Sequence, residues 1–339
     1  MKSFSKFLID RSILLFSMVS LIFSTFAFNS SAASYSGKGT KSNPYLVKTG
    51  DQLQGISDNL SAHYKLANTI DLSGVDFKPI GSIAQPFTGS FVCDTNDDGT
   101  PKYAIKNLKI YNSAGEKNKH TVGSNVGYTD YKENNSKWEA ALFGAAKGAK
   151  FKNIAILDAD ITNTVVGQNR MNDDWSLNPG QDEMNASTLI GYGMSIVAEN
   201  CSATGKINSK SNHNGGLFGR LEDSDVKGCY AKVDISSSGF WCKGGFVGSG
   251  KNNKIVFCFS DSNLQVGMYR NGGFAGTQSG TIENCYALGS ISVGCAFHQT
   301  EESGLNVKNC ATKVLAAKPG EVDHNASAEN ALTLNAACQ

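Results

Sequence analysis

The sequence predicts an all-β protein, a right-handed parallel β-helix with coils of about 28 residues and a short capping helix at its N-terminal end. Two short motifs recur in register along the chain, which is typical of a stack of like units. Glycine is abundant, with 36 residues, while proline is rare, with 6, as expected of short strands joined by tight turns. Hydrophobic residues make up 40% of the chain, enough for a continuous core. Right-handedness follows from the general chirality of parallel strand connections.

The first motif is a Gly-Gly pair followed by two apolar residues and a third glycine. It is complete at 215–219, 244–248 and 272–276, and weaker copies begin at positions 140 and 187. The starts at 187, 215, 244 and 272 are almost evenly spaced, whereas the gap between 140 and 187 is much longer. An insertion predicted at about 166–186 accounts for the longer gap.

The second motif centres on cysteine and keeps step with the first. Cys201, Cys229, Cys258 and Cys285 follow the starts of the last four copies at a nearly constant distance, and Cys310 continues the series. Because a unit this small cannot bury its apolar face alone, we expect the repeats to stack in parallel, about 4.8 Å apart. A propeller would need repeats of about 40 residues. The stacked cysteines should be buried, reduced thiols, since parallel side chains do not reach disulfide geometry.

Residues 1–33 have the three-part layout of a secretory signal peptide. Lys2, Lys6 and Arg11 precede or open an apolar run, and small residues lead to an expected cleavage after Ala33. The alternative is an uncleaved N-terminal anchor, although the apolar run falls just short of a comfortable membrane span. We therefore expect a protein that is secreted or held at the cell surface, with the periplasm as an alternative. No second apolar run is long enough to span a bilayer, so no membrane contact is expected of the mature chain.

The rest of the chain divides according to its repeats. Leu53, Ile56 and Leu60 share one face of a short helix predicted over 50–62, which would block the open end of the stack. The predicted segments are a signal peptide at 1–33, an N-terminal cap with the first coils at 34–90, repeats at 91–312 and a C-terminal cap at 313–339.

The Gly-Gly-Phe-x-Gly motif followed by Asn-Cys-Tyr-Ala, as at 272–276 and 284–287, resembles the GLUG-motif repeats of bacterial secreted and cell-surface proteins. The lead-in at 39–47 is also similar to that family, and the resemblance covers about residues 38–312. It implies a right-handed β-helix outside the cell, often in adhesin-like chains. It implies no catalytic residues, since the residues of the motif are structural.

The segments just before each Gly-Gly pair predict a ligand-binding edge. Variable loops on one side of a repeat scaffold are where such proteins bind, and aromatic platforms beside amide and charged groups suit a glycan. The predicted ligand-binding residues are Trp175, His213, Trp241, Lys243, Tyr269, Arg270 and His298. We therefore predict a non-catalytic, adhesin-like protein whose partner is a polysaccharide or a cell-surface glycan. In the alternative, the aromatic side chains only seal turns.

A polysaccharide lyase or glycoside hydrolase acting on an acidic polysaccharide at the same edge is the alternative function. Parallel β-helices often carry such enzymes, but this is an analogy of fold alone. A lyase needs a cation beside the uronate carboxylate, for which Arg270 or Lys243 would serve, and a base for the α-proton, for which His298, His213 or Tyr269 would serve. A structural surface protein without a specific ligand is the third hypothesis.

Asp94, Asn96 and Asp98, followed by Gly99, match the start of a calcium-binding loop. The position that should be a bidentate glutamate is Ile105, so the EF-hand pattern is incomplete. We expect either a weak Ca²⁺ site or a surface hairpin rich in Asx turns, and no other cofactor.

The charge balance excludes one broad class of partner. The chain has 31 basic and 30 acidic residues, which argues against a nucleic-acid binder that neutralises phosphates. The sequence has no His-Glu-x-x-His motif, so metallopeptidase activity is not expected. We expect the mature chain to be a monomer.

Overall fold

The computed structural model describes residues 34–112, 119–122, 125–128, 139–164, 185–239, 241–267, 270–298 and 304–316. The chain divides into two units, Met1–Ser34 and Tyr35–Gln339, and every strand described below belongs to the second. The predicted signal peptide, most of the predicted insertion and most of the predicted C-terminal cap lie outside the described residues.

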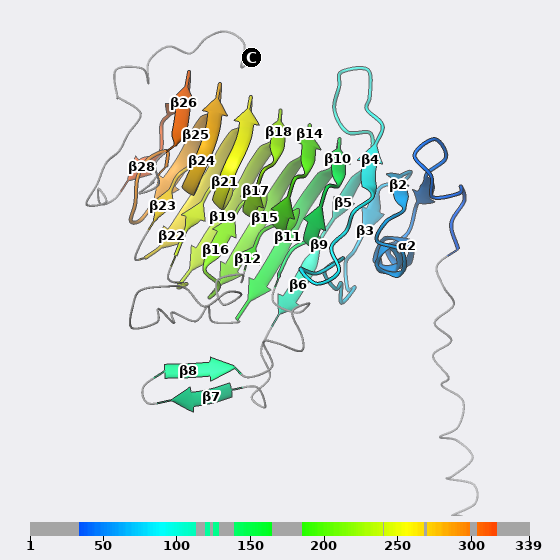
Figure 1. Cartoon of the computed structure of the whole chain (residues 1–339), viewed down its shortest axis with the longest axis horizontal. Helices are drawn as coiled ribbons and strands as arrows, with labels where there is room; N and C mark the ends of the chain where they lie inside the picture. The colour runs from blue at the N-terminus through cyan, green and yellow to red at the C-terminus, as the bar shows by residue number, and fades with distance from the viewer. Residues whose placement is uncertain are drawn as a thin grey trace, which may run out of the picture. The chain divides into compact units, whose positions relative to one another are not determined.

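The largest sheet has 12 strands, and all its pairings are parallel. Its strands are β1 (Tyr45–Val47), β2 (His63–Leu66), β4 (Ser90–Cys93), β9 (Phe143–Lys147), β10 (Lys150–Lys152), β13 (Ile190–Met194), β14 (Val197–Glu199), β17 (Phe218–Glu222), β18 (Asp225–Lys227), β21 (Val247–Val256), β24 (Ala275–Glu283) and β26 (Leu305–Lys308). Figure 1 shows these strands side by side along the stack.

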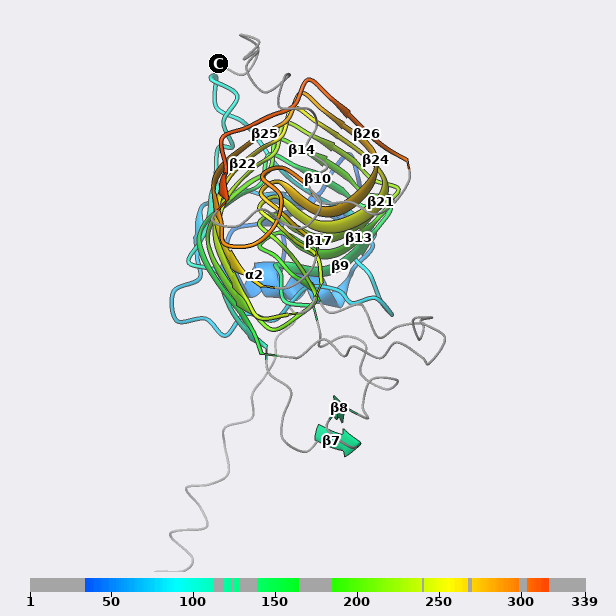
Figure 2. The same ribbon diagram turned by 90° about the vertical axis from the view of Figure 1, so that its left-hand side faces the viewer.

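A second parallel sheet has 10 strands and lies across the core from part of the first. Its strands are β3 (Ile70–Asp71), β5 (Ala104–Lys106), β6 (Lys109–Asn112), β11 (Ala155–Asn163), β15 (Ser202–Ser209), β19 (Tyr230–Ser237), β22 (Phe259–Val266), β25 (Tyr286–Ile291), β27 (Ala311–Thr312) and β28 (Leu315–Ala316). Figure 2 looks along the stack, and successive coils overlay one another there.

Shorter strands complete each coil. The four-stranded parallel sheet consists of β12 (Asn185–Ala186), β16 (His213–Gly215), β20 (Lys243–Gly244) and β23 (Asn271–Gly272). One coil therefore runs through β13, β14, β15 and β16 before the next begins at β17. A separate antiparallel hairpin is formed by β7 (Lys119–Val122) and β8 (Asn125–Tyr128).

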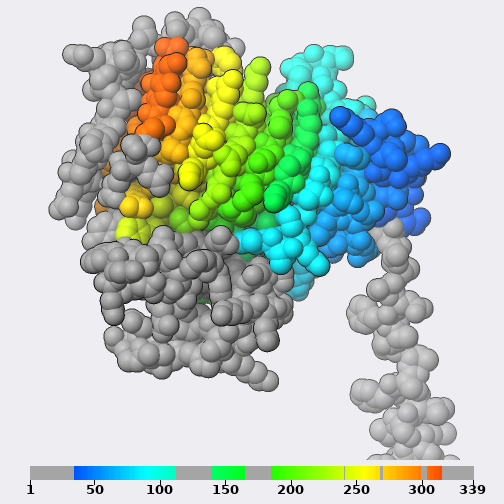
Figure 3. All heavy atoms as spheres, in the orientation of Figure 1, coloured from blue at the N-terminus to red at the C-terminus, as the bar shows by residue number. Residues whose placement is uncertain are grey.

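The register shows why the repeats stack. Ile207, Ile235, Leu264 and Ile291 occupy one position in four successive coils and are all buried. The residues between them along each strand face outward, as strand geometry requires. In Figure 3 each coil is a band of atoms beside the preceding one. The predicted parallel β-helix is confirmed, and so is the predicted length of its coils.

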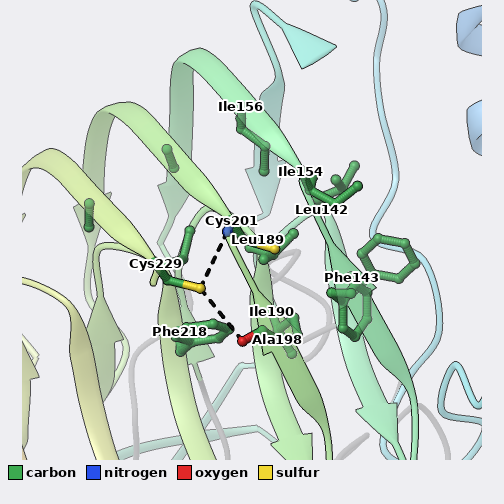
Figure 4. Close-up of a cluster of buried hydrophobic side chains, with 14 of the residues drawn as sticks. Leu142, Phe143, Ile154, Ile156, Leu189, Ile190, Ala198, Cys201, Phe218 and Cys229 are labelled. Carbon is green, nitrogen blue, oxygen red and sulfur yellow. Dashed lines mark hydrogen bonds between the residues drawn. The ribbon is translucent and has the colours of Figure 1, made fainter. Parts of the chain in front are cut away.

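The predicted cysteine row is present in the core. The backbone N–H of Cys201 donates to the Cys229 sulfur at 3.3 Å, and the same link joins Cys229 to Cys258 and Cys258 to Cys285 at 3.4 Å. Figure 4 shows the Cys229 sulfur between the Cys201 nitrogen and the Ala198 carbonyl oxygen. All described cysteines are buried and free, as predicted, and burial raises the pKa of the Cys201 and Cys258 thiols.

A short helical segment lies at the N-terminal end, as predicted, but it is shorter than the range 50–62. The α-helix α2 (Gly50–Gln54) continues as a 3₁₀-helix, η1 (Gly55–Asp58). The Thr49 hydroxyl caps α2 by accepting from the Gln52 N–H at 3.2 Å, and Leu53 and Ile56 are fully buried. Within the described residues, no helix has the length and apolar character needed to cross a membrane.

The third glycine of the first motif permits a close approach of two backbones. A Cβ atom on Gly248 would lie 2.6 Å from the Gly219 carbonyl oxygen and 2.8 Å from the Asn214 nitrogen. Only glycine fits where β16 packs so near β21. The motif is therefore explained by packing between coils and sheets, without any ligand.

Candidate functional site

The predicted ligand edge maps to the four-stranded sheet and the turns before it. His213 in β16 and Lys243 in β20 are buried. Trp241 and Arg270 are partly exposed, and the Arg270 guanidinium lies 5.0 Å from the centre of the Trp241 ring. Two predicted members, Trp175 and Tyr269, lie outside the described residues. The structure thus leaves Trp241 and Arg270 as the accessible described members of this edge.

Lys243 is a structural residue and not a solvent-facing cation. It has no exposed surface, and its Nζ donates to the Gly239 carbonyl oxygen. Burial lowers the pKa of Lys243 to about 8, because the ammonium is poorly solvated there. Asn214 and Asn271 occupy the same position in neighbouring coils and donate to carbonyl oxygens three and four residues earlier. All three side chains therefore close the turn before a Gly-Gly pair.

His298 lies at a different place from the one predicted. It forms a β-bridge with Ala275 of the largest sheet, and the Phe297 ring stacks on Phe274 with 4.9 Å between ring centres. His298 thus takes the place of Ala275 in the next coil, and this place follows a Gly-Gly pair. The physical reason is that the last coil is shorter. Fewer residues separate Phe297 from its stacking partner Phe274 than separate Phe274 from its own partner Phe246.

The residues of the predicted lyase site are not gathered on an accessible surface. Lys243 is buried in the four-stranded sheet, and His298 is buried beside the largest sheet. His213 is also buried, which leaves Arg270 as the partly exposed member of the described candidates. The described candidates thus include an accessible cation but no accessible base.

Asp94, Asn96 and Asp98 belong to a hydrogen-bonded surface hairpin. Asp94 forms an ion pair of 2.8 Å with Lys65. The Asn96 amide donates to the Thr100 hydroxyl at 3.0 Å, while Asp98 accepts from the Thr100 N–H and hydroxyl at 2.9 and 2.6 Å, which lowers the pKa of Asp98. Asp94 thus pairs with Lys65, while Asn96 and Asp98 both bond Thr100. This arrangement fits the hairpin better than the calcium alternative. Among the described residues, no cluster of three or more His, Cys, Asp or Glu could hold a metal.

A polar groove crosses the outer face of the ten-stranded sheet. It has a volume of about 760 Å³ and is lined by residues of β11, β15, β19, β22 and β25. Two columns of outward side chains form its floor, because equivalent residues of successive coils lie side by side. The first column is Asp160, Lys206, Asp234, Asn263 and Ser290, and the second is Thr162, Asn208, Ser236 and Gln265.

Hydrogen bonds between coils hold the first column in place. Lys206 lies 3.3 Å from the Asp160 carboxylate. The Asn263 amide donates to Asp234 at 2.9 Å, and the Ser290 hydroxyl donates to the Asn263 oxygen at 2.9 Å. The groove therefore presents preorganised carboxylate, amide and hydroxyl groups on rigid strands.

An aromatic ladder lies on the same outer face beside the groove. The rings of Tyr230, Phe259 and Tyr286 stack with centres 5.1 and 5.5 Å apart and interplanar angles of 10°. Between ladder and groove, Lys232 forms an ion pair of 2.8 Å with Asp261. Burial first, and then the Asp261 charge, raise the pKa of Tyr230. Alternation along β19, β22 and β25 places all five residues outward.

This groove could also be predicted from the sequence, but the Gly-Gly motif is the more prominent pattern. The stretches 202–209, 230–237 and 259–266 alternate between buried and outward residues, and the outward ones are mainly polar. Aligned by the cysteine motif, they give the two polar columns directly. The variable segments before each Gly-Gly pair predicted a site at their own edge of the stack, the Gly-Gly edge, instead.

Comparisons with known proteins support the fold. No protein-family model matches the chain. Halomucin from Haloquadratum walsbyi (strain DSM 16790 / HBSQ001) is 38% identical in an alignment of 104 residues, which covers 27% of this chain and 1% of halomucin, so the chain spans a very small part of that relative. The structure is similar to "a putative immunoglobulin A1 protease from Bacteroides ovatus", with a TM-score of 0.56 and 20% identity, over 86% of this chain and 81% of that chain. This likeness shows the fold.

Proposed function

We propose that this chain is a non-catalytic, carbohydrate-binding β-helix of a secreted or cell-surface protein, and that it binds a neutral glycan in the polar groove. The observation that carries the proposal is the groove of about 760 Å³, whose polar lining comes from five adjacent strands. Binding sites of this kind are pre-formed concavities with a few placed polar groups.

The chemistry of the lining suits sugar hydroxyls, which both donate and accept hydrogen bonds. Asn263 and Gln265 offer amide donors and acceptors, Ser236 offers a hydroxyl and Asp234 offers a carboxylate. Because adjacent strands repeat at about 4.8 Å, these groups recur at regular intervals, as the hydroxyls of a linear glycan do.

The charges favour a neutral glycan over an acidic one. The lining holds one lysine and two aspartates, and Lys206 is already paired with Asp160. An acidic polysaccharide would meet the Asp234 carboxylate without a free cation in the lining, and like charges disfavour association. This differs from the acidic substrate expected of the lyase alternative.

Tyr111 extends the groove by one coil. Strand β6 pairs with β11, and the register places Tyr111 beside Thr162 of the lining. Tyr111 is 61% exposed, so its ring is available to the apolar face of a sugar. It supplies the aromatic platform that the Gly-Gly edge was expected to provide.

Other features support a position outside the cell. Residues 1–33 have the layout of a secretory signal peptide, and the repeats resemble the GLUG motif of surface proteins. The similarity to halomucin over 104 residues is consistent with a mucin-like setting. An adhesin-like role follows if the glycan belongs to another cell or to a matrix.

Calorimetric titration of the mature chain with cellohexaose, chitohexaose, mannohexaose and xylohexaose tests the proposal. We expect at least one to bind, and Asn263→Ala to weaken that binding about tenfold, because it removes hydrogen bonds worth about 1.4 kcal/mol in total. Lys254→Ala, an exposed residue of the largest sheet, is the matched control. Failure of every probe to bind, or unchanged binding by Asn263→Ala, would contradict the proposal.

A further inference from the structure

One column of residues in the stack has a left-handed backbone conformation. Its members immediately precede the cysteine position, where the chain turns from the largest sheet to the ten-stranded sheet. They are Asn153, Asn200, Gly228, Phe257, Asn284 and Asn309, with φ between 51° and 63°. Glycine and asparagine are the residues that tolerate this conformation. Phe257 is the member that does not fit the rule.

Phe257 has a backbone conformation that is unfavourable for a residue with a bulky side chain. A bulky side chain in this region is a true outlier and carries strain, which the equivalent Asn284 of the next coil avoids. Burial does not account for the ring, because Phe257 is 46% exposed. The Lys227 Nζ lies 6.0 Å from the ring centre. Backbone outliers of this kind are found where function requires the side chain.

The space beside the ring is open. Gly228 takes the place of Phe257 in the preceding coil, and a Cβ atom built on it would meet no atom within 4 Å. One coil further, the Asn200 amide donates to the Gly99 carbonyl oxygen at 3.0 Å and to the Asn153 oxygen at 2.9 Å. Asn200 and Phe257 are two coils apart, or about 10 Å. Open space therefore lies over Gly228, between the Asn200 and Phe257 positions, with the Lys227 ammonium near the ring.

The surroundings favour a sugar over a protein partner. The large hydrophobic residues exposed within the described part of the chain are Val75, Tyr111 and Phe257, which come from three separate segments. A protein interface needs a contiguous apolar core, whereas a sugar needs one apolar face ringed by hydrogen-bonding groups. Phe257 with Lys227 and Asn200 meets the second requirement.

We propose that Phe257 forms a second carbohydrate subsite, which binds a neutral sugar ring against the exposed ring, in the open space over Gly228. This inference rests on the proposed function, because it assumes that the groove binds the same polymer. Phe257 lies about 20 Å from Asn263, at about 3.3 Å for each of the intervening residues. The columns of the groove run across the strands, whereas Phe257 is displaced from Asn263 along the strand direction. A hexasaccharide that follows the columns therefore leaves this subsite empty, while a long polysaccharide that continues to Phe257 engages both, and its affinity gains from the linkage.

Affinity electrophoresis in soluble xylan and mannan, together with hexasaccharide titration, tests the subsite. Phe257→Asn introduces the residue of the neighbouring coils, so we expect its melting temperature to be no lower than that of the wild type. Its dissociation constant for the retarding polysaccharide should rise at least about tenfold, with hexasaccharide affinity unchanged. Phe257→Tyr keeps the ring and should bind the polysaccharide as the wild type does.

The outcomes separate the two proposals. If the wild type binds no hexasaccharide, the proposed function fails. If hexasaccharide binds and Asn263→Ala weakens that binding, but Phe257→Asn is retarded as strongly as the wild type, only the second subsite is overturned. A melting temperature several degrees lower in Phe257→Asn, with the same polysaccharide affinity, would show instead that the ring serves packing.

Discussion

Replacing Lys243 by methionine tests the assignment of this residue as a buried, structurally used lysine. The fully buried ammonium has a pKa of about 8 in the folded chain, against about 10.4 when unfolded. That difference corresponds to about 3 kcal/mol, by which the charged form is disfavoured at neutral pH. Methionine is of similar length and uncharged, but it loses the hydrogen bond to Gly239. We expect Lys243→Met to raise the free energy of unfolding at pH 7 by about 1–3 kcal/mol.

The pH dependence supplies the sharper measurement. Between about pH 8 and pH 10.4 the unfolded chain binds one more proton at Lys243 than the folded chain, so wild-type stability gains relative to the variant as pH rises through this window. Urea unfolding at several pH values from about 7 to 10.5 should show the advantage of Lys243→Met shrinking towards zero. Lys251→Met, an exposed site on β21, should show no such trend. A variant that is less stable at pH 7, by an amount independent of pH, would refute the reasoning.

Two further predictions follow from the packing of the coils. Gly248→Ala should lower the free energy of unfolding by about 2 kcal/mol or more, because its Cβ would lie 2.6 Å from a backbone oxygen. The control Gly267→Ala, whose Cβ would meet no atom within 4 Å, should change the free energy of unfolding by less than about 0.5 kcal/mol. Equal effects of the two substitutions in urea unfolding would contradict the close-approach argument. The eight described cysteines should react with a thiol reagent only after unfolding, since all are buried and free, and a melting temperature that falls on adding reductant would reveal a disulfide instead.

The repeat architecture was predictable because each coil makes the same local demands. The third glycine of the motif, as at Gly248, is required because two backbone segments approach closely at this position of each coil. The left-handed turn before Cys201, Cys285 and Cys310 recurs with asparagine for the same reason. Because the residues that meet these requirements recur at a fixed spacing in the sequence, periodicity alone predicted the stack, its register and the cysteine row.

The candidate site was less predictable for two physical reasons. The direction of a side chain at a coil edge depends on how the turn closes. Lys243 lies in a variable segment, where an outward side chain is expected, but it points inward and donates to the Gly239 carbonyl oxygen. A coil that shortens moves every later residue, and this displaced His298 from the place given by its spacing. The polar columns of the ten-stranded sheet are formed by residues one full coil apart in the chain, such as Lys206 and Asp234, so they are seen only when the strands of successive repeats are aligned with one another.

The central claim is that a glycan occupies the outer face of the ten-stranded sheet, and hydroxyl-radical footprinting with the binding hexasaccharide tests it most directly. The oxidation rates of Tyr111, Tyr230, Phe259 and Trp241 report on side chains in each candidate region. We expect saccharide to slow oxidation of Tyr111 at the groove end and to leave Trp241 of the Gly-Gly edge unchanged. Slower oxidation of Trp241, with Tyr111, Tyr230 and Phe259 unaffected, would place the ligand on the other edge and contradict the claim.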